Sequence, residues 1–597
     1  MSQTAGKIPA QPGVRDYTAN VSNFGELQNA IGQALQDGDA HIYINNDIDI
    51  VGTINITGTS GTEVIRLIGS PDNMPVLKRT SSFINYFFSV ENVILRVENI
   101  ILDGNLEEIN KSVNCKSLIC PRDKTKLYLG GNTILKNNYS GAYWLGGGAI
   151  CTEGDITEGV EITMSDSARI TGNETDGYGG GINIGVNGVV VGVSKIIMTN
   201  NSSIDGNTAQ RNGGGVYATH TNIEMFDHSI IKGNNSVREG GGGLFAVRSP
   251  HITISQNSRI VLNEAAEHGG GIVTNNVYGS EASMMTLKDD ASIENNTTRT
   301  RDGGGIYLQD EIIFTMADQS KLCGNKSYGN GGGLFAAHPN SSDGATIIIN
   351  GETQICDNET LYGNGGGLYL NTKNTTISGT ASFKSNKAPN ANGGAIGLET
   401  RNELHVGPGV TFSENKAAVA YDFNEADRES YEENIEATVF SYGFKEGYNN
   451  YDIQYSSSQT LQPHNITYTD GEGEEVVYPL FDGQTLKDIP PPARENAQFR
   501  GWYADEAHNN KLDEYAPIAQ DMTVYPLLEC NAGYTQVVAD GKITCEKVLP
   551  QWRHKLSHID GDGVCPANAA MHYYRAGTLV KEKPDVCDLF MLSLVLE

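Results

Sequence analysis

The sequence contains no long hydrophobic run. The closest approach is LFMLSLVL at 589–596, which is far shorter than the roughly 20 apolar residues of a membrane-spanning helix. We therefore expect no direct membrane insertion by this chain. Its first residues, MSQTAGKIPAQPGVRDY, also lack the charged start and apolar centre of a signal peptide. The protein is then cytosolic, exported by an unusual route, or shown in trimmed form, and we favour the last interpretation.

Positive charge is also scarce, because 42 basic residues stand against 72 acidic ones and the formal net charge is −30. The resulting field repels phosphate backbones and anionic headgroups, which argues against nucleic acid and membrane partners. The nine cysteines include no CxxC pair, so the spacing of a zinc ribbon is absent, and their odd number leaves at least one thiol unpaired within the chain. Glycine, in contrast, reaches 70 of 597 residues, which suits a turn-rich β protein.

The glycines belong to a repeat. In each copy an apolar residue is followed three positions later by asparagine, and neighbouring asparagines lie 27 to 36 residues apart. After all but the last copy comes a glycine cluster that ends in an apolar residue, as in GGGL at 331–334. The ten copies are Ile134/Asn137, Ile170/Asn173, Ile204/Asn207, Ile231/Asn234, Ile260/Asn263, Ile293/Asn296, Leu322/Asn325, Ile355/Asn358, Phe383/Asn386 and Phe412/Asn415.

Apolar and polar residues alternate between the glycines and the next asparagine. In IYLQDEIIFTMADQSKLCGN we expect one face to hold Ile306, Leu308, Ile313 and Leu322. A period near 30 residues without a helical stripe predicts a coil of parallel β-structure, in which each coil buries its apolar face against its neighbours. The glycines then provide positive φ and close approach at a tight corner. The asparagine tolerates left-handed geometry and bonds the same residue one coil away, about 4.8 Å along the stack.

The paired motifs resemble the GGA(I/L/V) and FxxN repeats of chlamydial polymorphic membrane proteins and related bacterial surface proteins. GGAI at 147–150 and 393–396, FKSN at 383–386 and FSEN at 412–415 match that pattern letter for letter. Most other copies carry glycine in place of the alanine and isoleucine in place of the phenylalanine. Over roughly 134–415, the resemblance implies the β-helix fold and the role of a surface adhesin.

The segments upstream of the repeat predict further, less regular coils of the same solenoid, preceded by a helix that caps its N-terminal end. Runs such as HIYINNDIDI and EVIRLIGS alternate like strands, and they follow NFGELQNAIGQALQDGD. In that segment Asn23 and Glu26 predict a capping box, and one helical face is apolar. A helix here would cover the end of the solenoid, which otherwise exposes apolar core and unpaired strand edges. The apolar face consists of Phe24, Leu27, Ile31 and Leu35.

A different module begins near 456–465, after the glycine pattern stops and an acidic, tyrosine-rich stretch has passed. It resembles the Listeria–Bacteroides repeat, a small β-grasp-like module of internalin-type surface proteins, through its DGQTL turn, the prolines at 490–492, FRGWY at 499–503 and DMTVYPLL. It departs from that repeat at 496–497, where a Gly-Tyr pair usually stands. The resemblance implies a secreted surface protein.

Within this module we expect Trp502 and Phe499 to lie in the core and not to contact a ligand. HIDGDG at 558–563 has a faint similarity to a calcium loop, but it lacks the ligand spacing and closing glutamate of an EF-hand. We therefore predict no metal and no cofactor. The tail holds four cysteines, which allow two disulfides in three connectivities: Cys530, Cys545, Cys565 and Cys587.

Parallel β-helices also carry polysaccharide lyases and hydrolases, whose reactions need clustered carboxylates, or carboxylate-bound calcium beside a basic residue. The adjacent carboxylates Asp289 and Asp290 fit an ordinary polar turn better, and no NTD, GHG, RIK, HExxH, nucleophile-elbow or GKS/GKT signature is present. Cys323 and Cys356 occupy equivalent places in the repeat, which favours packing over nucleophilic catalysis. We therefore predict no catalytic residue and keep a polysaccharide lyase or hydrolase as the alternative.

The segment between each asparagine and its glycines recurs at the same place in every coil, but the types of side chain in it differ from coil to coil. We predict that successive coils stack these side chains on one ridge, a strip of aromatic and cationic groups on an acidic protein. Such a strip would hold a host or environmental glycan or protein, because tyrosine and arginine are frequent anchors at interfaces. A hydrated row of turns is the plainer interpretation. The residues of this turn ridge are Tyr178, Arg211, Arg238, His268, Arg301, Tyr328 and Tyr362.

Together these observations predict a non-catalytic, adhesin-like protein that is secreted or displayed at a bacterial cell surface. Besides the enzyme, a passive structural stalk or surface-layer component is a further alternative. The predicted parts are an N-terminal segment and helix cap (1–40), the right-handed parallel β-helix (41–425), an acidic linker or C-terminal cap (426–465), a Listeria–Bacteroides-type β-grasp repeat (466–529) and a cysteine-containing tail (530–597).

Overall fold

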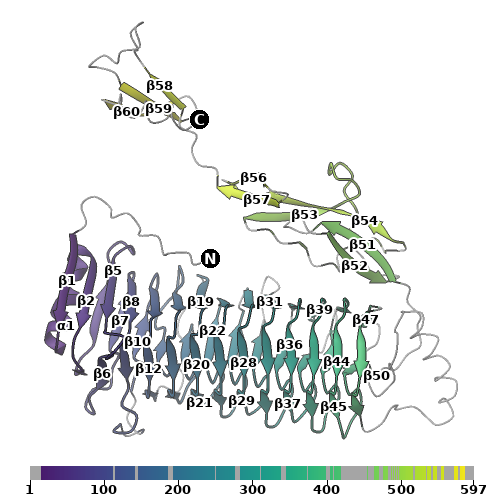
Figure 1. The fold of residues 1–597 in the computed structure, drawn as a ribbon, viewed down its shortest axis with the longest axis horizontal. Coiled ribbons are helices and arrows are strands. Elements are labelled where there is room, and N and C mark those ends of the chain that lie inside the picture. The colour runs from purple at the N-terminus through teal and green to yellow at the C-terminus, as the bar shows by residue number, and fades with distance from the viewer. Residues whose placement is uncertain are drawn as a thin grey trace. The chain divides into compact units, whose positions relative to one another are not determined.

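The computed structural model is nearly all β, and the described residues form one α-helix, α1 (Phe24–Asp37) (Figure 1). The chain divides into two compact units, Met1–Gln462 and Pro463–Glu597, and each is described by itself. The structure describes residues 15–417 apart from 110, 112–114, 142–145, 186–191, 249–250, 276–282, 310, 338–343, 373, 399–403 and 408; it also describes 453–454 and discontinuous stretches between 463 and 584.

Four sheets of parallel strands, here called A to D, build the first unit, and successive coils of chain add one strand to each sheet (Figure 1). Sheet A runs from β1 (Arg15–Val21) to β47 (Leu404–Val406), and sheet B from β3 (Ile48–Ile50) to β48 (Thr411–Ser413). Sheet C runs from β4 (Ile54–Thr57) to β50 (Ile453–Gln454), and sheet D from β13 (Tyr139–Ser140) to β49 (Lys416–Ala417). The predicted parallel β-helix is confirmed, including the less regular coils before the repeat.

One coil shows how the repeat maps onto the sheets. Sheets A, B, D and C in turn receive β35 (Ile312–Met316), β36 (Lys321–Cys323), β37 (Lys326–Ser327) and β38 (Leu334–Ala337). The inward side chains of all coils join in one hydrophobic core that extends from Val21 to Ile453. Each coil therefore buries its apolar face on the coils before and after it, as the period predicts.

The alternation is confirmed at three of the four positions named above, since Ile306, Leu308 and Leu322 are buried. The prediction for Ile313 is wrong. Strand β35 buries Ile312 and turns Ile313 outward. Two neighbouring isoleucines cannot both face the core of one strand, and the choice between them follows from pairing with the preceding strand of sheet A, β31 (Ser283–Leu287).

The glycine clusters make the tight corner between sheets D and C. Gly331 has φ 64°, a left-handed conformation that side chains disfavour. A Cβ on the following Gly332 would lie 2.3 Å from the carbonyl oxygen of Gly366, one coil further on. Close approach of neighbouring backbones therefore requires glycine here, as predicted.

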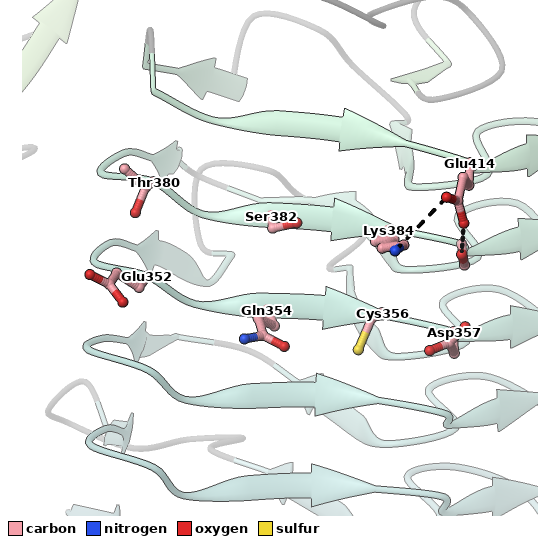
Figure 2. Close-up of a pocket in the computed structure, with 9 residues that line it drawn as sticks. Glu352, Gln354, Cys356, Asp357, Thr380, Ser382, Lys384 and Glu414 are labelled. Atoms are coloured by element: carbon pink, nitrogen blue, oxygen red, sulfur yellow. Dashed lines mark hydrogen bonds and ion pairs between the residues drawn. The ribbon is translucent and has the colours of Figure 1, made fainter.

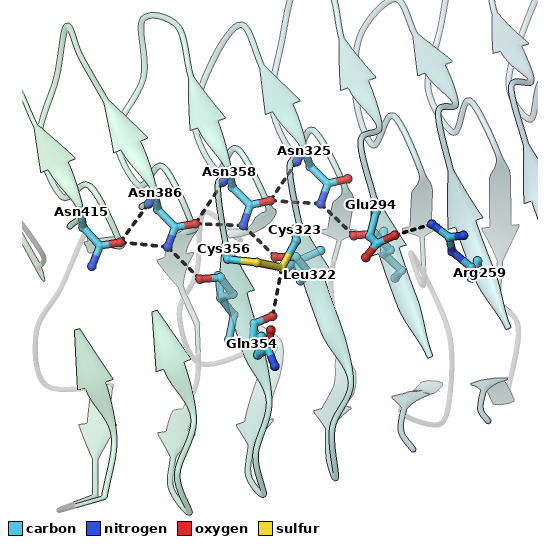
Figure 3. Close-up of a disulfide and its surroundings, with 12 residues drawn as sticks. Arg259, Glu294, Leu322, Cys323, Asn325, Gln354, Cys356, Asn358, Asn386 and Asn415 are labelled. Carbon is cyan, nitrogen blue, oxygen red and sulfur yellow. Dashed lines mark hydrogen bonds and ion pairs between the residues drawn. A yellow bond between two sulfur atoms is a disulfide. The ribbon is translucent and has the colours of Figure 1, made fainter. Parts of the chain in front are cut away.

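Buried asparagines form a ladder beside this corner (Figure 3). The side-chain Nδ2 and the backbone amide of Asn325 both donate to Oδ1 of Asn358 at 3.0 Å, and Nδ2 also donates to the carbonyl of Ile293. The same pattern repeats in the neighbouring coils, which confirms the predicted amide bonding between coils. The ladder consists of Asn138, Asn173, Asn207, Asn234, Asn263, Asn296, Asn325, Asn358, Asn386 and Asn415.

Two details of the predicted asparagine differ from the structure. In the first copy the ladder member is Asn138, whereas the predicted Asn137 precedes it with φ 52°. The left-handed residue is thus the one before the ladder asparagine, as Gly324 with φ 68° also shows. Two consecutive asparagines made the first copy ambiguous, and the strand register resolves it by pairing Leu135 with Ile170.

Arg79 closes the N-terminal end of the ladder. Its side chain is fully buried, and Nη2 donates to Oδ1 of Asn138 at 2.9 Å and to the carbonyl of Lys116 at 3.0 Å. Nη1 donates to the carbonyl of Asn85, and the guanidinium lies 4.9 Å from the ring centre of Phe87. Burial lowers the pKa of Arg79 to about 10, so the group remains charged at neutral pH. The aligned amide oxygens of the ladder point toward this cation and stabilise it.

Helix α1 covers the N-terminal end, where β1 pairs in register with β2 (Gly38–Ile44). The side chain of Asn23 accepts from the amide of Glu26 at 3.0 Å, while the Glu26 carboxylate accepts from the amide of Ser22 at 2.8 Å. The predicted capping box therefore forms with Ser22 as the backbone donor. The predicted apolar face packs on the core through Leu27 and Ile31, which are buried, and Phe24 and Leu35, which are partly buried.

The second unit begins with antiparallel strands β51 (Pro463–Thr469) and β52 (Glu475–Phe481), and β51 also pairs with β54 (Met522–Thr523). Strand β53 (Ala497–Tyr503) pairs with β55 (Tyr525–Cys530). Trp502 is buried among the rings of Tyr468 and Phe499, which confirms its place in the core, and Phe499 packs against that core half-buried. The similarity to the Listeria–Bacteroides repeat remains a prediction.

Short antiparallel strands follow in the tail. They are β56 (Tyr534–Ala539), β57 (Lys542–Lys547), β58 (Arg553–Leu556), β59 (Ala570–Arg575) and β60 (Thr578–Pro584). A disulfide joins Cys530 to Cys545, which narrows the three possible connectivities of the tail to one. Cys565, Cys587 and the segment 558–563 lie outside the described residues.

Candidate ligand-binding surface

The residues of the turn ridge lie at the corner before the glycines, but they do not form one continuous stack as predicted. Backbone hydrogen bonds align the residue before the left-handed glycine of each coil, so that Gly179 donates to Asn212 and Gly241 to His268. Tyr178 and His268 belong to that column, whereas Arg211 stands one residue earlier. The ridge residues stand three to five positions after the ladder asparagine of their coil, and this difference shifts the side chains sideways.

Tyr178 and Arg211 are brought together. The Arg211 guanidinium lies 4.6 Å from the ring centre of Tyr178, and its Nε bonds Oε1 of Glu239 at 2.8 Å. Asn212 donates to the second oxygen of the same carboxylate at 2.6 Å. The charge of Arg211 is therefore balanced by Glu239 while its guanidinium packs on the Tyr178 ring.

His268 and Arg301 form a second group. The His268 ring lies 4.3 Å from the ring of Tyr307, and its Nδ1 is 3.8 Å from Oδ2 of Asp302. Burial lowers the pKa of His268 to about 4, helped by the charge of Arg301, and burial also raises the pKa of Asp302. Arg301 itself lies 3.8 Å from the carboxylate of Glu267. At neutral pH His268 is an uncharged aromatic surface.

Tyr328 and Tyr362 are the most exposed aromatic residues of the ridge, at 43% and 59%. Their ring centres are 4.8 Å apart with planes tilted by 58°, and Leu361 beside them is 42% exposed. These three side chains form an apolar patch on the corner. Arg238 is exposed on the same row of turns.

Sequence analysis missed a second set of rings on the outer face of sheet C. Tyr217 stacks on Phe245 with ring centres 5.6 Å apart, and Phe335 stacks between Tyr307 at 4.9 Å and Tyr369 at 5.4 Å. These five residues, here called the aromatic ladder, lie on β22 (Val216–Thr219), β26 (Leu244–Val247), β34 (Ile306–Gln309), β38 and β42 (Leu368–Asn371). The sequence pattern that could have predicted these rings is an aromatic residue directly after the apolar residue that ends a glycine cluster, as in GGGVY, GGGLF and GGGLY.

The aromatic ladder and the turn ridge meet. Tyr178 lies 4.8 Å from Tyr217, and His268 lies 4.3 Å from Tyr307, each measured between ring centres. We call the aromatic ladder together with Tyr178 and His268 the aromatic face. Its rings are half-buried except for that of Phe335, which is buried, and its tyrosines add hydroxyl groups. This combination suits sugars or apolar side chains.

A polar groove of about 720 Å³ lies on the outer face of sheet B, over β40 (Gln354–Cys356) and β44 (Ser382–Lys384) (Figure 2). Figure 2 shows Glu352 and Glu414 at opposite ends of these strands, so these carboxylates do not converge. Glu414 lies 3.8 Å from Nζ of Lys384 and accepts from the Ser385 hydroxyl at 2.9 Å. The groove is therefore a strip of polar side chains without a converging carboxylate pair at its two ends.

The adjacent carboxylates considered in the sequence take part in a turn. Oδ2 of Asp289 accepts from the amide of Gln256 at 2.9 Å, and the amide of Asp289 donates to Asp318 at 3.0 Å. Asp289 thus links neighbouring coils. In the described part of the chain, no cluster of three or more His, Cys, Asp or Glu could hold a metal ion.

Cys323 and Cys356 are paired one coil apart, and they form a disulfide on the outer face of sheet B (Figure 3). The predicted packing role is therefore wrong. Equivalent positions in neighbouring coils bring two side chains side by side, and with cysteine this proximity allows a covalent bond.

Residues 196–219 match the Chlamydia polymorphic membrane protein repeat. The matched stretch starts in β19 (Ser194–Met198), ends with β22 and therefore spans one coil, with Arg211 and Tyr217 inside it. This repeat is typical of bacterial outer-surface proteins, and it confirms that part of the resemblance.

No curated protein and no solved structure matches the chain. Among the described residues, no helix has the length and apolar character needed to cross a membrane.

Proposed function

We propose that this protein is a non-catalytic, adhesin-like protein, secreted or displayed at a bacterial surface, that binds a host or environmental ligand through the aromatic face. The observation that carries the proposal is two runs of ring contacts that cross coils: Tyr178–Tyr217–Phe245 and His268–Tyr307–Phe335–Tyr369. Val273 takes the sheet C position between the two runs. A solenoid with such a strip presents one extended surface, which is the usual way in which repeat proteins bind.

The chemistry of the face favours a neutral glycan or an apolar protein segment. Arg211 is balanced by Glu239, and His268 is neutral, so the rings contribute more than charge. The net charge of −30 disfavours polyanionic ligands. Tyrosine supplies both an apolar surface and a hydroxyl donor, which is why it is frequent among interface residues that dominate binding.

Two further observations support display outside the cytosol. The repeat in residues 196–219 is typical of bacterial outer-surface proteins. The disulfides Cys323–Cys356 and Cys530–Cys545 persist in oxidising compartments and are rare in the cytosol.

Native electrophoresis through gels cast with bacterial, plant and host polysaccharides tests the proposal. We expect retardation without clearing of the polysaccharide around the band. The triple variant Tyr217→Ser/Tyr307→Ser/Tyr369→Ser should abolish the retardation, while Tyr43→Ser, a partly exposed tyrosine on β2, should leave it unchanged. If the folded triple variant were retarded as much as the wild type, the role of the aromatic face would be overturned. Host-cell binding assays with the same variants test for a protein ligand.

The groove on sheet B supports a second candidate, a polysaccharide lyase or hydrolase, because Asp357 and Glu414 line the same end of it. Clearing of the gel around the band would favour this candidate. Loss of clearing in Glu414→Gln, with Glu506→Gln as the surface control, would then place catalysis in the groove. A passive stalk would show neither retardation nor clearing and no saturable binding to cells.

A further inference from the structure

Cys120 and Cys151 occupy matching positions on neighbouring strands of sheet C. Strands β10 (Ile119–Pro121) and β14 (Ile150–Cys151) are parallel, with Ile119 opposite Ile150. The next residue along each strand is a cysteine. Since Ile119 and Ile150 point into the core, alternation puts both thiols on the outer face of the sheet. In-register neighbours are about 4.8 Å apart, which lies within the Cα separation of disulfides.

The same helix contains a pair with this arrangement. Cys323 and Cys356 are opposite each other on β36 and β40, with Cα atoms 4.5 Å apart, and they are bonded. Their sequence separation is 33 residues, and that of the second pair is 31 (151 − 120). One coil of this solenoid therefore brings two cysteines within disulfide range.

The surroundings of Cys120 and Cys151 differ from those of the bonded pair. Both side chains are buried, at 0% and 2% exposure, next to the buried Tyr86. Glu153 forms ion pairs with Lys116 at 3.3 Å and with Arg122 at 3.2 Å in the same cluster. The structure holds both as thiols, and burial raises the pKa of each to about 12. Protein that folds with these cysteines reduced therefore keeps them protonated and unreactive.

We propose that Cys120 and Cys151 form a second disulfide between coils, made while the chain folds in an oxidising compartment and before this cluster closes over them. A disulfide of low molecular mass or of an oxidoreductase is the oxidant. The thiolate of one cysteine attacks a sulfur of the oxidant, forms a mixed disulfide and releases the first thiol of the oxidant. The thiolate of the other cysteine then attacks this mixed disulfide, forms the Cys120–Cys151 bond and releases the second thiol of the oxidant. The two cysteines lose two protons and two electrons in all, and the oxidant leaves as two thiols.

Tryptic peptide mapping without reduction tests this inference on the full chain. Reduced protein unfolded in urea is refolded in a mixture of oxidised and reduced glutathione, and remaining thiols are alkylated before digestion. We expect peptide 117–122 linked to peptide 137–169. The linked peptides 322–326 and 327–373, which contain Cys323 and Cys356, are the internal control. Protein first folded in reductant and then given the same mixture should show alkylated Cys120 and Cys151 after denaturation.

Variants distinguish this pairing from others. Cys115→Ala should retain the link, because its thiol lies in a separate peptide, 112–116. Cys151→Ala should leave Cys120 alkylated. The inference is overturned when the control link forms but 117–122 remains alkylated, or when Cys115 takes part in the link. The wild-type map decides the matter even when a variant does not fold.

Discussion

Each buried asparagine of the ladder serves three partners at once. Asn296 donates to Oδ1 of Asn325 and to the carbonyl of Ile260, and its own Oδ1 accepts from Asn263, all at about 3.0 Å. Nine of the ten asparagines were identified from the sequence, whereas Asn138, the direction of the hydrogen bonds and the cation at their end were not. Arg79 lies far upstream of the repeat, and only the coiling of the chain brings it to Asn138.

Replacing Asn296 by alanine removes these hydrogen bonds and leaves a backbone carbonyl and amides unsatisfied inside the molecule. We expect a loss of about 3 kcal/mol in the free energy of unfolding. Urea denaturation followed by circular dichroism measures it. Asn201→Ala, in an exposed turn, is the matched control and should change the midpoint little. Equal midpoints for the two variants would contradict the structural role of the ladder.

Glu63 predicts a dependence of stability on pH. Burial alone raises the pKa of its carboxylate, but hydrogen bonds from the Thr59 hydroxyl and from the amides of Thr59 and Ser60 outweigh burial and lower it to about 2. Because the folded pKa lies below the unfolded value of 4.5, the stabilisation is present above pH 4.5 and is lost as the pH falls toward 2.

Denaturation at pH 7 and pH 3 tests this dependence. Glu63→Gln should lower the urea midpoint at pH 7 and narrow the difference between the two pH values. Glu107→Gln, an exposed carboxylate, serves as the control. A variant with an unaltered pH profile would show that Glu63 does not provide the effect.

The strands recur in every coil, but the residue types on their outer faces differ between coils. Most core positions could be predicted from the alternation of apolar and polar residues, because burial of one face fixes the register of a strand. The turn ridge was predicted as one stack, but its residues stand at different distances after the ladder asparagine. Tyr328 is three residues after Asn325, Arg211 four after Asn207 and Tyr178 five after Asn173. The aromatic ladder escaped prediction because outward positions on strands were taken as polar. An aromatic residue after the apolar one in GGGVY and GGGLF was the available signal.

Replacing glycine by alanine should have opposite effects on stability at the corner between sheets D and C and in helix α1. Gly332→Ala should destabilise the protein by about 3 kcal/mol, since its Cβ would lie 2.3 Å from a carbonyl oxygen held by the next coil. Gly32→Ala in α1 meets no atom within 4 Å and should stabilise by about 0.5–1 kcal/mol through helix propensity. Thermal unfolding of both variants decides this, and shifts of the same sign would contradict the close approach of backbones at the corner.

At the scale of the whole molecule, the β-helix is a series of coils in contact with their nearest neighbours. The sequence predicted this architecture because a repeat that cannot bury its own apolar face must stack. The equivalent places of Cys323 and Cys356 in the repeat were visible in the sequence, but they were interpreted as packing positions, because the sequence does not show that both side chains point outward. The pairing of Ile453 with Ile396 was also hidden, because no glycine pattern marks the segment that returns to sheet C.

Loss of the Cys323–Cys356 bond should lower the stability of the helix by about 3–4 kcal/mol, the effect expected for closing a loop of 33 residues. The variant Cys323→Ser/Cys356→Ser, followed by limited proteolysis, should show earlier cleavage within this coil. Cys530→Ser/Cys545→Ser should leave cleavage in the β-helix unchanged, because that bond lies in the second unit. Unchanged cleavage in the first variant would contradict the prediction.

The bond between coils has a mechanical consequence. Backbone hydrogen bonds between parallel coils run along the axis of the solenoid, so a pull in that direction opens them one coil at a time at low force. The covalent link from Cys323 to Cys356 prevents the residues between these two cysteines from being extended. In a tether under flow, such a link would stop unravelling at one coil and limit how far the protein lengthens under load.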